Sequence, residues 1–258
     1  MKINIMTLFP EMFAPLTASM IGRAAERGLI EFNIVNIRDY TTDRHNRVDD
    51  TPFGGGQGMV MQVQPILDCY RQNGFGGRVI YMSPRGRKLT GELVAALAGE
   101  REFTILCGHY EGVDERALAL LSAEEVSIGD YVLTGGELPA MVLADAVSRF
   151  IPGVLSSEAS VLEESIYSGL LEYPQYTKPR ETDGLAVPDV LLSGNHQEIA
   201  LWRFEQSLRL TKERRPDLFE QYLEELQGRK LSKAERRIFE RVTRDECDTE
   251  SGAEDTDI

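Results

Sequence analysis

Short apolar runs alternate with amphipathic stretches along the first part of the chain. Runs rich in β-branched residues predict strands at residues 3–8, 32–37, 79–82, 103–107 and 126–128. Apolar positions at helical spacing predict helices near residues 12–27, 63–72, 89–98, 114–121 and 138–150. Strands that alternate with helices are typical of an α/β domain around a mostly parallel sheet.

Farther along the chain the pattern changes twice. Pro, Gly, Ser and Tyr are frequent between residues 151 and 194, which predicts a linker or functional loop. Three helices are then predicted at residues 197–212, 217–227 and 232–244, the last with a capping box of Ser232 and Glu235. The expected domains are residues 1–155 (α/β), 156–193 (linker), 194–244 (small and all-helical) and 245–258 (a disordered acidic tail).

The predicted helix at residues 138–150 has a regular apolar stripe. Every fourth residue is apolar, namely Leu138, Val142, Ala146 and Phe150. This spacing predicts that the stripe is buried against the core. Arg149 then lies beside the stripe, at the end of the helix.

Charge is distributed unevenly along the sequence. The net charge of −14 argues at first against nucleic acid as a partner, because Lys and Arg carry phosphate binding. By segment, residues 1–197 carry 16 basic and 26 acidic residues (−10), residues 198–244 carry 12 and 9 (+3), and residues 245–258 carry 0 and 7 (−7). The last helix presents basic residues at spacings of three to four, namely Lys233, Arg236, Arg237, Arg241 and Arg244. Such a face is either a solvated surface or a phosphate-binding one.

Membrane and disulfide-rich classes do not fit the sequence. No apolar run approaches the roughly 20 residues of a spanning helix, and the first residues begin a strand pattern rather than a signal peptide. Cys69, Cys107 and Cys247 are too few and too far apart for a disulfide framework or a zinc site. We expect a soluble, cytoplasmic protein without a membrane partner.

Candidate chemistry lies where three of the predicted strands end. Glycine or turn-forming residues follow these strands at residues 81–84, 107–112 and 128–136. Ligands of open parallel sheets bind beyond the carboxyl ends of the strands, and glycine lets backbone groups approach a ligand closely. The three loops predict the walls of one small-molecule pocket or, alternatively, only tight turns.

The same loops carry motifs that resemble a known family. The motifs are YMSP from Tyr81, CGHYEGVDER from Cys107, IGDYVLTGGELPA from Ile128, RFIPG from Arg149, DDTPFGGGQGM from Asp49, YTKP from Tyr176 and LLSGNH from Leu191. Together they are similar to the bacterial tRNA (guanine-N1)-methyltransferases, the TrmD family of the knotted SPOUT class. The resemblance extends in order over about residues 1–225.

The resemblance implies a fold and a methyl-donor site. The α/β domain would contain a trefoil knot, formed where the last strands and the helix after Gly136 thread through a loop. Two copies would form a homodimer with active sites at the subunit interface, and S-adenosyl-L-methionine would bind among the three loops. The contacts carried over to this sequence are Tyr81, Ser83, Pro84, Gly108, Tyr110, Glu111, Gly112, Ile128, Gly129, Asp130, Tyr131, Val132, Leu133, Gly135, Gly136 and Pro139.

The resemblance also implies two catalytic residues. Glu164 would remove the proton from N1 of guanine, and Arg149 would stabilise the negative charge that spreads towards O6. The family usually has Asp where Glu164 and Glu172 stand here. Because glutamate reaches one methylene farther, Glu163 and Glu172 remain alternative bases. His109 stands where many relatives have Arg, and would face the tRNA or the donor, or have a structural role.

The function implied is methyl transfer from S-adenosyl-L-methionine to N1 of guanosine 37 in tRNA, beside the anticodon and preceded by G. The helical domain would bind tRNA, and residues 156–193 would order over the target base. The alternatives are a knotted RNA methyltransferase with another target nucleotide and a catalytically degenerate RNA-binding relative. The family also implies Mg²⁺, for which the sequence offers no ligand cluster.

Overall fold

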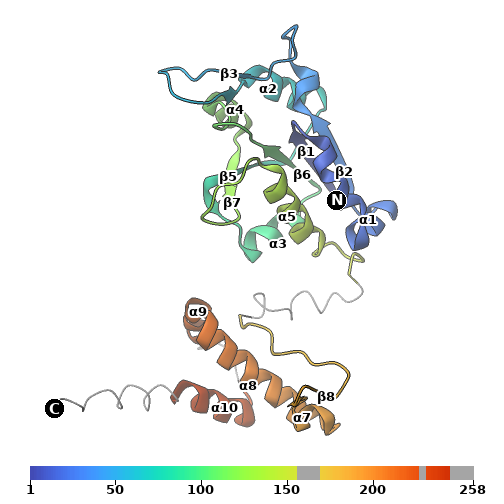
Figure 1. Ribbon diagram of the computed structural model, residues 1–258, viewed down its shortest axis with the longest axis vertical. Helices are drawn as coiled ribbons and strands as arrows, with labels where there is room; N and C mark the ends of the chain where they lie inside the picture. Colours follow the sequence, from blue (N-terminus) through green and yellow to red (C-terminus); the bar gives the residue numbers. More distant parts are fainter. Residues whose placement is uncertain (156–168, 227–230, 245–258) are drawn as a thin grey trace, which may run out of the picture. The chain divides into compact units, whose positions relative to one another are not determined.

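The first of two compact units in the chain is built on a five-stranded parallel sheet. The computed structural model describes residues 1–155, 169–226 and 231–244, and the units are Met1–Glu158 and Ala159–Ile258. The strands are β1 (Lys2–Thr7), β2 (Glu31–Asn36), β5 (Arg78–Lys88), β6 (Glu102–Cys107) and β7 (Glu124–Ser127). Their order is β2-β1-β6-β5-β7, and every neighbouring pair is parallel (Figure 1). The predicted parallel α/β sheet is confirmed.

Helices cover both faces of the sheet. One face carries η1 (Pro10–Thr17), α1 (Ser19–Glu26), α3 (Gly91–Ala98) and α5 (Glu137–Ser148), and the other carries η2 (Ile37–Tyr40), α2 (Val63–Gln72) and α4 (Glu115–Leu121) (Figure 1). Within β1, Ile3 and Ile5 face the first group and Met6 faces the second. A strand buried on both faces needs apolar residues at nearly every position, which explains the unbroken apolar runs of the sequence.

The single helix predicted over residues 12–27 is wrong. The structure has the 3₁₀ helix η1 and then α1, with the chain turning at Ser19, where φ is 58°. The two helices approach so closely that a Cβ on Gly22 would lie 2.2 Å from the carbonyl oxygen of Thr17. A helical pattern spanned both elements because tertiary packing, rather than local propensity, sets the break.

The buried stripe predicted on α5 is wrong for its first two residues, whereas Ala146 and Phe150 are partly buried and pack against the core. Leu138 and Val142 are 48% and 47% exposed, whereas Leu143 and Val147 on another face are fully buried. Because α5 is apolar on several sides, the spacing of its residues did not distinguish the core face from a second apolar face. The first unit therefore presents an uncovered apolar surface on this helix.

Two short strands lie between β2 and α2. β3 (Asp49–Asp50) and β4 (Val60–Met61) form an antiparallel pair around the glycine-rich segment.

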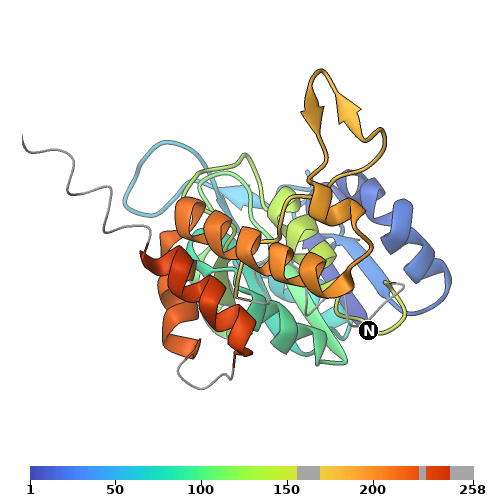
Figure 2. The same ribbon diagram turned by 90° about the horizontal axis from the view of Figure 1, so that it is seen from below.

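In the region expected to be a linker, β8 (Glu181–Thr182) and β9 (Leu185–Ala186) form a hairpin, followed by α7 (Asp189–Leu192). The hairpin projects away from the helices of its own unit (Figure 2).

The second unit contains the helices α8 (His196–Arg214), α9 (Pro216–Leu226) and α10 (Lys233–Arg244). They share an apolar cluster of Leu208, Phe219, Tyr222, Ile238 and Val242, joined by Leu170. The predicted capping box is confirmed, since Ser232 Oγ accepts from the Glu235 amide and Glu235 Oε2 accepts from the Ser232 amide. None of the helices in the described parts of the chain is long and apolar enough to cross a bilayer.

Buried and exposed leucines of the first unit predict different losses of stability on truncation to alanine. We expect Leu143→Ala to lower the free energy of unfolding by about 2–5 kcal/mol, because it removes a fully buried side chain. Leu120→Ala, at a side chain that is 64% exposed on α4, is the control and should change it by about 0.5 kcal/mol or less. Urea denaturation at matched protein concentration measures both, and equal losses would contradict this assignment of the core.

Candidate functional site

A cavity of about 310 Å³ lies at the carboxyl ends of β6, β5 and β7. These strands are neighbours in the sheet, so the loops that follow them meet at one edge. All the residues expected to contact a methyl donor line this cavity except Asp130, whose carboxylate lies 3.1 Å from Lys88 Nζ. The structure thus brings together three loops that lie at residues 81–84, 107–112 and 128–136 of the sequence.

The wall from β5 and β6 is aromatic and closely packed. Tyr81 is 7% exposed, and burial raises the pKa of its phenol. A Cβ on Gly108 would lie 2.8 Å from the Tyr81 ring, so a larger residue at position 108 would displace the ring. Glycine is therefore required here for a close approach of backbone to ring.

The loop after β7 forms a second, apolar wall. It is fixed at its start by Ser127 Oγ, which accepts from the Gly129 amide at 3.2 Å and donates to the Gly129 carbonyl at 3.0 Å. Tyr131, Val132 and Leu133 follow, and all three are exposed and line the cavity. Apolar side chains beside free backbone groups suit a flat heteroaromatic ring.

The amino end of α5 closes the cavity against β6. The amide of Gly136 donates to the carbonyl of Gly108 at 2.9 Å. A Cβ on Gly136 would lie 2.7 Å from the Cα of Cys107, a backbone atom that cannot move aside cheaply. The Gly135-Gly136 pair of the sequence is therefore a packing requirement of this junction.

The glycine-rich segment between β3 and β4 adjoins the loop after β6. The amide of Glu111 donates to the carbonyl of Met59, and the amide of Met61 donates to the carbonyl of Gly112, both at 2.9 Å. Gly58 has φ of +84°, and a Cβ there would meet the side chain of Glu111. The segment from Asp49 is thus placed beside the cavity.

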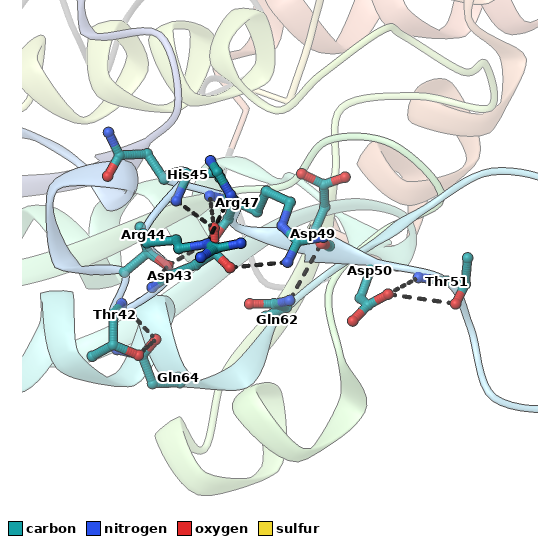
Figure 3. A network of polar contacts seen from close by, with 12 residues as sticks. Thr42, Asp43, Arg44, His45, Arg47, Asp49, Asp50, Thr51, Gln62 and Gln64 are labelled. Atoms are coloured by element: carbon teal, nitrogen blue, oxygen red, sulfur yellow. Dashed lines mark hydrogen bonds and ion pairs between the residues drawn. The ribbon is translucent and has the colours of Figure 1, made fainter.

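A tightly bonded turn precedes that segment (Figure 3). The carboxylate of Asp43 accepts from the amides of His45 and Arg47 and from the Arg47 guanidinium, which lies 3.0 Å away. The Arg47 guanidinium holds the pKa of Asp43 at about 2. The turn exposes Arg44, His45 and Arg47 to solvent.

Several lining residues were not identified from the sequence. Arg85 lies in the cavity wall with its guanidinium 2.7 Å from Glu115 and 3.0 Å from Glu125. His109, for which the sequence left a ligand-facing or a structural role open, lines the cavity as well, and its Nε2 lies 2.7 Å from the carboxylate of Glu137. Arg85 directly follows the YMSP motif, which was the only sequence signal for it.

The structure does not bring Arg149, the expected catalytic cation, to the cavity within one chain. Arg149 follows the last turn of α5, whereas the cavity lies at the first turn, and a helix of this length spans about 18 Å. Glu163 and Glu164 lie outside the described residues. Glu172 lies in the second unit, where its carboxylate accepts a hydrogen bond from Gln175 at 2.6 Å.

The positions of the His, Cys, Asp and Glu side chains show whether the described residues could bind a metal ion. Among residues 1–155, 169–226 and 231–244, no group of three or more His, Cys, Asp or Glu side chains is placed to hold a metal ion. No role in the site is therefore assigned to Mg²⁺.

Comparisons with known proteins bear on the motifs of the cavity. The family described as tRNA (guanine-1)-methyltransferase TrmD matches residues 1–221. The chain is 56% identical over 224 residues to the tRNA (guanine-N(1)-)-methyltransferase of Ruminiclostridium cellulolyticum, covering 85% of this chain and 96% of that protein. It is 53% identical over 233 residues to the enzyme of that name from Clostridium acetobutylicum (90% and 96%), and 55% over 240 residues to that from Geotalea uraniireducens (88% and 97%). The matched residues include all three loops of the cavity.

The contact between α5 and β6 predicts a sharp difference between two glycines. Gly136→Ala should lower the free energy of unfolding by about 1–3 kcal/mol, because the new Cβ meets backbone atoms of Cys107 and Gly108. Gly99→Ala is the matched control, since Gly99 has helical dihedrals and a Cβ there makes only ordinary contacts. Chemical denaturation measures both, and a Gly136→Ala protein as stable as Gly99→Ala would refute the tight junction.

Proposed function

Because the chain belongs to the tRNA (guanine-1)-methyltransferase TrmD family, we propose that it methylates N1 of guanosine 37 in tRNA, where a G precedes that guanosine, with S-adenosyl-L-methionine as methyl donor. The observation that carries the proposal is that the family match covers the loops whose residues line the cavity. The names of the relatives favour guanine N1 over another target nucleotide, and over a protein without activity.

The cavity residues fit the methyl donor. Gly108 and Gly136 line the cavity with backbone at positions where a Cβ would collide with Tyr81 or Cys107, and the exposed residues around Val132 offer apolar contacts for an adenine ring. Tyr81 offers an aromatic face on the opposite wall. When bound, S-adenosyl-L-methionine supplies an electrophilic methyl group on its sulfonium sulfur.

The reaction then requires a base and a cation at the guanine. Nitrogen N1 forms a bond to the methyl carbon while the carbon–sulfur bond breaks, and the electron pair of that bond goes to sulfur. Glu164 takes the N1 proton, and Arg149 stabilises the charge that develops towards O6. Glu163 and Glu172 are the alternative bases.

The site is completed by a second copy of the chain in a homodimer. Arg149 and the cavity lie at opposite ends of α5, which is about 18 Å long, so one chain cannot supply both to the same guanine. Leu138 and Val142 form an uncovered apolar surface on that helix, near exposed Met12 and Phe9 of the η1 region. A partner copy on this surface would cover it, as obligate dimers do.

A trefoil knot accounts for the path of the chain after the last strand. β7 lies at the edge of the sheet, yet α5 returns to pack against β6 and β1 in the middle, with Gly136 bonded to Gly108. Knots are rare, so the resemblance to the family and this return path are needed together to support one.

The second unit binds the tRNA. On α10, Lys233, Arg236, Arg237 and Arg244 are exposed while Ile238 and Val242 are buried, which leaves a basic face for phosphates. The family resemblance implies that the segment 156–193 orders over the target guanine. A tRNA substrate favours a cytoplasmic location. Magnesium remains an expectation of the family.

The specificity follows from the proposed target. Incubated with labelled S-adenosyl-L-methionine, the protein should methylate a tRNA transcript with G36 and G37, and should act at least about tenfold more slowly on transcripts with A at either position. Absence of label in every transcript would contradict the proposal.

In the same assay, Arg149→Ala should lower kcat by about 10²-fold or more, because it removes the charge that stabilises the transition state. Arg71→Ala, at an exposed arginine on α2, is the matched control.

The shared site makes activity depend on the dimer. Val142→Asp should convert the protein to a monomer in sedimentation velocity and remove methylation, because a carboxylate is costly in an apolar interface. Leu120→Asp, at an exposed leucine on α4, should leave both the oligomeric state and the activity unchanged. A monomeric and active wild-type protein would rule out the shared site.

A further inference from the structure

A buried carboxylate joins three parts of the first unit at the cavity wall. Glu137, in the first turn of α5, is 1% exposed. Its Oε1 accepts from Thr7 Oγ1 at 2.6 Å, and its Oε2 lies 2.7 Å from His109 Nε2. Thr7 is the last residue of β1, and His109 belongs to the loop after β6. We name Thr7, Glu137 and His109 the loop clamp.

Both partners of Glu137 must donate to it. A carboxylate has only acceptor atoms, so the hydrogen of the contact is carried by His109 Nε2. Burying a carboxylate without donors costs several kcal/mol, and the positive end of α5 offsets only part of that cost. The charge of Glu137 contributes, after burial, to the raised pKa of the neighbouring Cys107 thiol. Loss of either donor therefore leaves one buried carboxylate oxygen without its hydrogen-bond partner.

His109 is fixed on both sides of its ring. Its imidazole lies 4.7 Å from the ring of Phe9, centroid to centroid, and packs so closely on Gly135 that a Cβ there would be 2.4 Å away. His109 lines the cavity, whereas Thr7 and Glu137 lie behind it. The imidazole thus connects the loop after β6 to the Gly135-Gly136 end of the loop after β7.

We propose that the loop clamp is a positioning device for the methyl donor: the hydrogen bonds of Glu137 hold the loops after β6 and β7 at the separation that donor binding requires. This inference rests on the proposed function. His109 and Glu137 are positioning residues, since they act through the loops. Their loss should raise Kd and KM for the donor more than it lowers kcat at saturating donor.

Two buried threonines provide a matched test. Thr7→Val removes the donor to Glu137 with little change of shape. Thr104→Val removes an equally buried hydroxyl on β6 that has no contact with Glu137. The Thr104 hydroxyl accepts from Asn4 and donates to the Gly76 carbonyl. Calorimetric titration with S-adenosylhomocysteine, alongside thermal unfolding, should give a Kd raised about tenfold for Thr7→Val and unchanged within about twofold for Thr104→Val. Both should lose similar stability.

The histidine is tested by its hydrogen-bond capacity. His109→Gln keeps a donor for Glu137 and should bind S-adenosylhomocysteine within about threefold of wild type, whereas His109→Phe keeps the ring, lacks the donor and should bind at least about tenfold more weakly. Unchanged binding by Thr7→Val, or equal weakening by Thr104→Val, would overturn the loop clamp. A wild-type protein that binds no S-adenosylhomocysteine would instead overturn the proposed function.

Discussion

The first turn of α5 lies against the end of β6 at a distance that leaves no space for a side chain. The Gly136 amide bonds to the Gly108 carbonyl, and a Cβ on Gly136 would come within 2.7 Å of the Cα of Cys107. This contact returns the chain from the sheet edge to its centre, where α5 buries Leu143 and Val147. The same contact brings the loop after β7 to face the loop after β6. Without it, the two walls of the cavity would not meet.

Placing α5 there also buries a charge, which constrains the residues around it. Glu137 cannot reach water, so Thr7 and His109 must supply its hydrogen bonds. The other ion pairs at the cavity, such as Arg85 with Glu115, are largely exposed and contribute little to stability. The buried carboxylate therefore couples the core of the first unit to the shape of the site, which the surface pairs do not.

The sequence predicted the features that depend on local pattern. The strands, the parallel sheet and the meeting of three glycine loops followed from apolar runs and from the rule on strand ends. The capping box of Ser232 was also predicted, because it is a short-range contact. Features set by distant residues were missed or mistaken. The break between η1 and α1 at Ser19 follows from tertiary packing, and the apolar face of α5 with Val142 is uncovered although its spacing resembles a core stripe.

The candidate site also has some features that the sequence predicted and others that it did not. Every residue expected in its lining except Asp130 lies there, because the motif residues are in the loops themselves, and Asp130 pairs with Lys88 instead. Other lining residues, such as Arg85, were not predicted. The bond from His109 to Glu137 joins residues 28 positions apart, and no periodicity predicts such a pair. Arg149, expected as a catalytic residue, lies in one chain at the end of α5 far from the cavity, and the second copy that we propose would complete the site.

The central claim is that the three loops at the ends of β6, β5 and β7 hold the methyl donor. A crystal structure of the protein with S-adenosylhomocysteine tests it most directly. The account predicts the adenine against the backbone around Val132, with Tyr81 and Gly108 on the opposite wall. A ligand bound elsewhere, with this cavity filled only by water, would contradict it.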